Sequence, residues 1–157
     1  METTIFTSQI GIIAITSDAE CLVNILVENI KKCEQVKSPF NDYVNFQLKE
    51  YFSGKRTDFD VPIKFLIGSD FDKKVWASLL TIPYGQTLSY QEVAVNIGNS
   101  KASRAVGNSV GRNPLPIIVP CHRVIRSDGS IGGFSLDINI KKELLKIEQM
   151  DGLKKNY

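Results

Sequence analysis

The feature that most constrains the fold of this 157-residue chain is an apolar segment at residues 114–125, PLPIIVPCHRVI. Its run at residues 117–119 is long enough for one buried strand, and Pro120 ends that strand because proline has no N–H to donate to a ladder. We therefore predict that Cys121 lies at a strand end. The next residue is His122, the only histidine in the chain.

The neighbours of Cys121 allow two interpretations. Free cysteine is among the most buried residue types, so Cys121 fits the role of a small hydrophobic core residue. The imidazole of His122 and the charge of Arg123 stand beside it, however, and such groups stabilise a thiolate over a thiol. A pKa lowered by about two units from ~8.5 is worth roughly 2.7 kcal/mol and makes most of the thiol anionic at neutral pH. The spacing alone does not decide between the two.

Composition narrows the class of protein. Hydrophobic residues make up 43% of the chain, enough for a core, and no apolar run approaches the length of a membrane span. With no signal-peptide pattern, we expect a soluble cytoplasmic protein. Residues 1–68 carry a net charge of −2 and residues 69–157 a net charge of +4. This basic excess fits a polyanionic partner, and it equally fits an ordinary solvated surface.

The cysteine count argues against a metal site. Three cysteines, an odd number with no C-x-x-C spacing and one histidine beside them, do not make a structural zinc site or a disulfide framework. We expect no metal and no cofactor. A bridge between Cys21 and Cys33 is left open.

The first part of the chain predicts a small sheet with one helix. Three short β-branched segments separated by turn-forming residues indicate an antiparallel meander: residues 3–7, 10–16 and 21–27. Pro39 begins a helical pattern that runs to residue 52. Residues 59–67 are predicted as a further strand, at an edge because of Pro62. We assign residues 1–66 a supporting role.

The second part is predicted to be mostly helical. Ser69 or Asp70 caps a helix over residues 70–80, and a capping box at residues 89–92 begins a helix that ends at Gly98. A further helix over residues 101–107 completes a helix-turn-helix. A turn at residues 126–129 and a glycine-rich loop at residues 131–135 follow, then a helix over residues 138–150.

The second helix of this pair has unusual side chains. Its exposed residues are small: Ala102, Ser103, Ala105 and Gly107. Small residues let a backbone approach closely, which suits a narrow minor groove read by shape, whereas a helix in the major groove offers long polar side chains. Arg104 is then the one long cation, placed to enter a base stack, or alternatively a plain surface charge.

Taken together, residues 69–150 resemble the O6-alkylguanine-DNA alkyltransferase family of direct-reversal DNA repair proteins. The resemblance rests on four segments: IPYGQTLSY at residues 82–90, RAVG at 104–107, NP at 113–114 and IVPCHRVI at 118–125. It implies an α+β protein with an RNase H-like sheet-and-helix domain at residues 1–66. It also implies a winged helix-turn-helix-like domain with the active-site cysteine at residues 69–150, and a tail at 151–157.

The resemblance further implies a function. Such a protein binds double-stranded DNA through the minor groove as a monomer, singly or cooperatively. It flips O6-alkylguanine out of the duplex and transfers the alkyl group irreversibly to its own Cys121. One molecule acts once, because a thioether is not opened by thiolate exchange.

Site roles follow by position. Cys121 corresponds to the nucleophile, His122 to the base that acts through a water, and Glu148 to the carboxylate that orients the imidazole. Asn113 corresponds to the brace of the active-site turn, and Tyr90 to the donor to guanine N3.

Arg104 corresponds to the finger that fills the vacated stack, on the small-residue helix. The implied base pocket comprises Pro116, Val124 through its carbonyl, Phe134, Ser135 through its amide, and Lys141.

Two departures and two alternatives accompany the resemblance. Where the family has tyrosine and a Gly-Gly pair in the closing loop, this chain has Phe134 and Leu136-Asp137, so we expect a stiffer loop. The main alternative is a module that recognises alkylguanine without repairing it, although relatives of that kind lack the cysteine. The other is a cysteine hydrolase, which would turn over.

Overall fold

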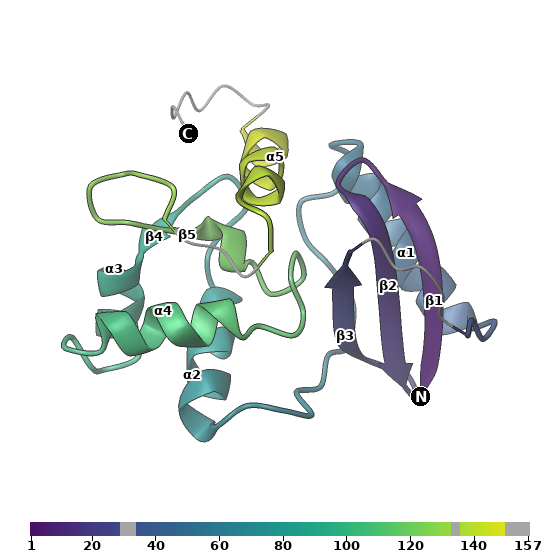
Figure 1. The fold of residues 1–157 in the computed structure, drawn as a ribbon, viewed down its shortest axis with the longest axis horizontal. Helices are drawn as coiled ribbons and strands as arrows, with labels where there is room; N and C mark the ends of the chain where they lie inside the picture. The colour runs from purple at the N-terminus through teal and green to yellow at the C-terminus, as the bar shows by residue number, and fades with distance from the viewer. Residues whose placement is uncertain (29–33, 133–135, 150–157) are drawn as a thin grey trace. The chain divides into compact units, whose positions relative to one another are not determined.

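The structure is a computed structural model that describes residues 1–28, 34–132 and 136–149 (Figure 1). The chain divides into two compact units, Met1–Leu66 and Ile67–Tyr157, which we describe separately. Among the described residues, no helix has the length and apolar character needed to cross a membrane.

The first unit contains the predicted antiparallel meander. Its strands are β1 (Glu2–Ser8), β2 (Gly11–Asp18) and β3 (Cys21–Val27), in the order β1-β2-β3. The register pairs Ile5 with Ala14 and Ile15 with Ile25. These β-branched segments suit a half-buried pleated surface, and strands β2 and β3 each contribute four buried residues.

One helix, α1 (Pro39–Phe52), packs on this sheet, as predicted (Figure 1). Ser38 caps it by accepting a hydrogen bond from the Asn41 N–H, and proline fits the first turn because its missing N–H would have no helical partner. The Asn41 side chain in turn donates to the Glu2 carbonyl at 3.1 Å. This bond ties the start of the helix to β1.

The predicted strand at residues 59–67 is wrong. Only Ile63 forms a bridge, to Leu22 of β3. The Leu22 N–H donates to the Pro62 carbonyl at 2.8 Å, and the Lys64 N–H donates to the Leu22 carbonyl at 2.9 Å. Pro62 has no N–H with which to extend the ladder, so the pairing stops after one residue. Cys21 is a free thiol, and Cys33 lies outside the described residues.

The second unit is mostly helical. Its elements are α2 (Asp70–Leu79), β4 (Leu88–Ser89), α3 (Tyr90–Asn96), α4 (Ser103–Gly111), the 3-10 helix η1 (Cys121–Arg123), β5 (Val124–Ile125) and α5 (Ile138–Glu148). Strands β4 and β5 form a short parallel pair. Capping boxes at Ser69 and Ser89 begin α2 and α3, which confirms both predicted starts.

Helix α4 is displaced from its predicted position. It begins at Ser103 and continues to Gly111, whereas residues 101–107 were expected to be helical. Val106 and Val110 are both buried, so the apolar stripe continues for a further turn and carries the helix past Gly107. Packing against α2 and α3 therefore sets the boundary.

The last helix, α5, begins at Ile138 as predicted and extends to Glu148, and Met150, where the predicted helix ends, lies outside the described residues. Asp137 caps it by accepting a hydrogen bond from the Asn139 N–H at 2.7 Å. The φ of Asp137 is −58°, so this position does not require the positive φ that glycine would favour. The turn at residues 126–129 is also present, with a bond from the Gly129 N–H to the Arg126 carbonyl at 3.0 Å.

Candidate active site

The segment before Cys121 is a tight turn, so the predicted strand at residues 117–119 is wrong. The Val119 N–H donates to the Leu115 carbonyl at 2.8 Å, and Ile117 has a φ of +77°. The Asn113 side chain closes the turn from both sides, because it donates to the Val119 carbonyl and accepts from the Leu115 N–H, each at 2.9 Å. The side chain of Asn113 thus makes the backbone hydrogen bonds that the apolar run at residues 117–119 would make in a strand.

Cys121 follows this turn at the start of η1 and is fully buried. Burial raises the pKa of its thiol to about 11, against smaller lowering contributions from a hydrogen bond with Asn113 and from the charge of Lys141. Of the two interpretations left open by the sequence, this state therefore matches a buried cysteine whose sulfur carries a proton at neutral pH. Removal of that proton has to accompany any reaction at the sulfur.

His122 faces away from water and bonds a carboxylate. Its Nε2 lies 2.6 Å from Glu148 Oε1, and both side chains are buried. Burial raises the pKa of Glu148, but the charge that His122 carries when it is protonated, its hydrogen bond and the contacts of Arg123 outweigh this and lower the pKa to about 2. An ionised carboxylate only accepts, so a neutral His122 carries its proton on Nε2. Its buried Nδ1, which bonds no described residue, is then the basic nitrogen.

Arg123 makes contacts that the sequence interpretation missed. Its guanidinium donates to both oxygens of Glu148, each at 2.9 Å, and to the Ile82 carbonyl at 2.6 Å. It also lies over the Tyr84 ring at 5.8 Å. The guanidinium of Arg123 therefore binds the carboxylate that bonds His122, in a two-pronged contact that we call the Arg123 fork. Its charge is thus paired with Glu148, whereas the sequence suggested an effect on the sulfur.

Lys141 lies buried against the backbone of β5. Its ammonium donates to the Val124 carbonyl at 2.6 Å. Burial lowers the pKa of Lys141 to about 8, against an opposing effect of Cys121. The structure thus brings together Lys141, Val124 and Cys121, three of the predicted site residues.

Tyr90, at the start of α3, is half-buried beside the same group. Burial raises the pKa of its hydroxyl, as does Cys121, while Arg126 lowers it. A Cβ at Gly132 would stand 3.1 Å from the Tyr90 hydroxyl oxygen, and Gly132 has a φ of +72°. Glycine at this position therefore lets the backbone approach the phenol closely. At Gly107 a Cβ would make ordinary contact with the Tyr90 ring, at 3.7 Å.

The predicted DNA-binding residues in and beside α4 differ in their exposure. Arg104 and Ala105 are exposed on α4, and Ser103 and Gly107 are half-buried. Ala102 is buried, which corrects the expectation that it is exposed, because it precedes the helix in a turn closed by its N–H bond to the Asn99 carbonyl.

Three more members of the predicted base pocket are Pro116, Phe134 and Ser135. Pro116 is buried and bridged to Val119, but Phe134 and Ser135 lie outside the described residues.

Within residues 1–28, 34–132 and 136–149, no three His, Cys, Asp or Glu side chains cluster as metal ligands.

Comparison with family models identifies two matching segments. Residues 70–150 match the model described as 6-O-methylguanine DNA methyltransferase, DNA binding domain. Residues 1–65 match the model described as 6-O-methylguanine DNA methyltransferase, ribonuclease-like domain.

Individual relatives agree. A methylated-DNA–protein-cysteine methyltransferase of Methanosarcina acetivorans is 44% identical over 150 residues, which cover 92% of this chain and 96% of the relative. The crystal structure of Mycobacterium tuberculosis OGT in complex with DNA has a TM-score of 0.85 and 40% identity, over 95% of this chain and 93% of that one. An O6-methylguanine DNA methyltransferase of Methanococcus jannaschii has a TM-score of 0.70 and 29% identity, with 98% of each chain covered.

Proposed function

Because this chain belongs to the 6-O-methylguanine DNA methyltransferase family, we propose that it repairs DNA by moving the alkyl group of O6-alkylguanine onto its own Cys121. The observation that carries this proposal is a buried series of three groups after the Asn113 turn. The thiol of Cys121 is followed by the imidazole of His122, and the carboxylate of Glu148 bonds that imidazole at Nε2, which leaves Nδ1 as its basic nitrogen. This nucleophile, base and orienting group is what thiol alkylation requires.

Proton removal is the first requirement, because the Cys121 thiol has a pKa of about 11. We assign His122 Nδ1 as the base, acting through a water, since adjacent side chains rarely bond directly. The imidazolium that forms is stabilised by Glu148, which the Arg123 fork keeps ionised and in place. The charge of Lys141 favours the thiolate in the same step. Asn113 keeps the sulfur's turn closed.

Alkyl transfer then forms a carbon–sulfur bond to Cys121 as the carbon–O6 bond breaks. The electron pair of the broken bond goes to the guanine, where negative charge develops. A proton donated by Tyr90 to guanine N3 would offset that charge, as electrostatic catalysis requires, and the phenolate would then regain the proton that His122 took from the thiol. The half-buried position of Tyr90 and its electrostatic coupling to Cys121 support this role.

The target base has to leave the duplex to reach a buried sulfur, at a cost of a few kcal/mol. We assign Arg104 to the space that the flipped nucleotide vacates, since it is exposed in the first turn of α4. The small side chains near it, of which Ala105 is exposed and Ser103 and Gly107 are half-buried, support binding of a monomer in the minor groove. Pro116, the Val124 carbonyl and Lys141 would border the base, with Phe134 and Ser135 as further proposed members.

The product is a thioether, so each molecule acts once and no cofactor takes part. A hydrolase would instead release the group and turn over. A recognition module would bind the lesion and leave it unchanged.

We expect Arg104→Ala to separate two substrates. Wild-type protein should accept the alkyl group both from a duplex with one O6-methylguanine and from free O6-alkylguanine, with one group gained per molecule. The variant should lose about a hundredfold in rate on the duplex but remain within about twofold on the free base, because only the duplex needs a filled stack. Single-turnover rate constants measure both. Equal losses would remove the finger role from Arg104.

A lysine close in sequence provides the control. Lys101 is exposed just before α4 and loses the same charge in Lys101→Ala, and this variant should keep both rates within about threefold. Wild-type protein that binds the duplex without gaining the group would indicate the recognition module, and repeated turnover would indicate the hydrolase.

A further inference from the structure

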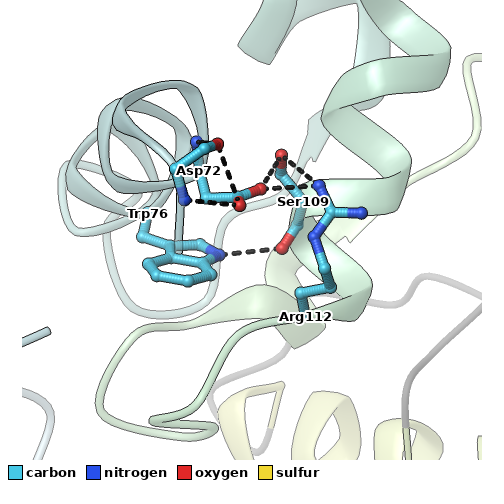
Figure 2. Close-up of polar contacts among 5 residues, drawn as sticks. Asp72, Trp76, Ser109 and Arg112 are labelled. Atoms are coloured by element: carbon cyan, nitrogen blue, oxygen red, sulfur yellow. Dashed lines mark hydrogen bonds and ion pairs between the residues drawn. The ribbon is translucent and has the colours of Figure 1, made fainter. Parts of the chain in front are cut away.

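Helix α4 is held at its C-terminal end by a buried carboxylate of α2. Asp72 Oδ1 accepts a hydrogen bond from the Ser109 hydroxyl at 2.6 Å and one from Arg112 Nη2 at 2.7 Å (Figure 2). The indole N–H of Trp76 donates to the Ser109 carbonyl at 2.8 Å. Ser109 is therefore bonded to α2 through both its side chain and its backbone.

The other oxygen of the same carboxylate holds the start of α2. Asp72 Oδ2 accepts from the backbone N–H and the hydroxyl of Ser69, each at 3.0 Å. Four donors thus surround an acidic side chain that is 4% exposed. Burial by itself raises the pKa of Asp72, but the bonds from Arg112, Ser109 and Ser69 together lower it, so the group is ionised at neutral pH.

The N-terminal end of α4 has a weaker local anchor. Its N-cap residue is Ala102, and no side chain of the described residues caps it. Arg104, in the first turn, is exposed. Because an α-helix rises 1.5 Å per residue, Arg104 lies roughly 7.5 Å along the axis from Ser109. The position of Arg104 therefore depends on how the far end of a rigid nine-residue helix is fixed.

We propose that Asp72 is a positioning residue for repair in duplex DNA: its carboxylate fixes the placement of α4 and so the reach of Arg104. The inference rests on the proposed function. Cys121 does not need this anchor to the same degree, because Asn113 holds the adjacent turn through separate bonds to Val119 and Leu115. Loss of the Asp72 contacts should hence impair the duplex reaction and spare the free-base reaction.

The test compares Asp72→Asn with Asp70→Asn. In either orientation the new amide of Asp72→Asn points a donor at the donors of Ser69, Ser109 or Arg112. Asp70 is exposed in the same helical turn, and its carboxylate makes no hydrogen bond or ion pair with other described residues. The control thus removes the same charge and leaves the contacts intact.

We expect the duplex rate constant of Asp72→Asn to fall about ten- to a hundredfold, with the free-base rate constant within about twofold. Asp70→Asn should change neither by more than about twofold. Rates are expressed per molecule able to react with excess free base, so a loss of folded protein does not imitate the effect. Ser109→Ala keeps the capping box of α2 and should lower the duplex rate about threefold to tenfold. This variant tests the positioning role if Asp72→Asn fails to fold.

Equal loss on both substrates, or no loss on the duplex beyond that of Asp70→Asn, would overturn the positioning role. Wild-type protein that accepts the group from neither substrate would refute the underlying repair function instead, so the two failures are distinguishable.

Discussion

Replacing Cys121 with alanine should abolish alkyl transfer from both duplex DNA and free O6-alkylguanine, by at least about a thousandfold. The change removes the only atom that we assign to bond the alkyl carbon. Alanine is smaller than cysteine, so it fits the buried space at the start of η1 without a clash. Binding to duplex DNA should persist, because α4 and its exposed Arg104 are unchanged.

The matched control is Cys21→Ala. Cys21 is a partly exposed free thiol in the first unit, and its loss should leave the transfer rate within about twofold of wild type. Single-turnover transfer and an electrophoretic binding assay measure the two properties separately. Transfer that survives in Cys121→Ala, or that disappears in Cys21→Ala, would assign the nucleophile elsewhere.

Glu148→Gln should have the second-largest effect, on both stability and rate. Glu148 balances the buried guanidinium of Arg123 and bonds the imidazole of His122. Removing one partner of a buried pair leaves an uncompensated charge and costs about 3–5 kcal/mol of unfolding free energy. The transfer rate should fall about a hundredfold, because an amide in place of the carboxylate no longer stabilises the imidazolium.

Stability should also lose part of its pH dependence in this variant. The pKa of Glu148 is lowered in the folded protein to about 2 from its usual 4.5. A carboxyl with a lowered folded pKa stabilises the fold fully above its unfolded pKa, and this contribution disappears as the pH falls through the folded value. Wild type should lose this share of stability between pH 4.5 and 2, and Glu148→Gln should not.

Urea unfolding midpoints at a constant slope measure these changes. Glu143→Gln is the control, because Glu143 lies on the same helix in an exposed pair with Lys146 at 3.2 Å. It should cost about 0.5 kcal/mol or less. A Glu148→Gln variant as stable as Glu143→Gln would show that the cluster contributes little.

Local signals in the sequence predict much of this fold. The meander, the start of α1 and the capping boxes of α2 and α3 depend on neighbouring residues, so they are visible in the chain itself. The failures involve distant partners. Residues 117–119 have the composition of a strand, but the Asn113 side chain takes the bonds that a ladder would use. Helix α4 runs beyond Gly107 because buried valines continue its packing.

In the candidate site, too, neighbouring residues were predictable from the sequence and distant partners were not. Cys121 and His122 are adjacent in sequence, whereas Glu148 was placed only through the resemblance to a family. The fork of Arg123 was missed, because nothing local tells that a residue beside the cysteine contacts the last helix and the Ile82 carbonyl. The sequence left the ionisation of Cys121 open for a related reason. Burial depends on the whole fold, and it outweighs the neighbouring polar groups.

The most direct measurement of the central claim is the mass of the intact protein and of its peptides after incubation with a duplex carrying O6-methylguanine. We predict a gain of one methylene unit per molecule, about 14 Da, located on the peptide with Cys121 and stable to added thiols. An unmodified protein beside repaired DNA, or the added mass on any other residue, would contradict the account.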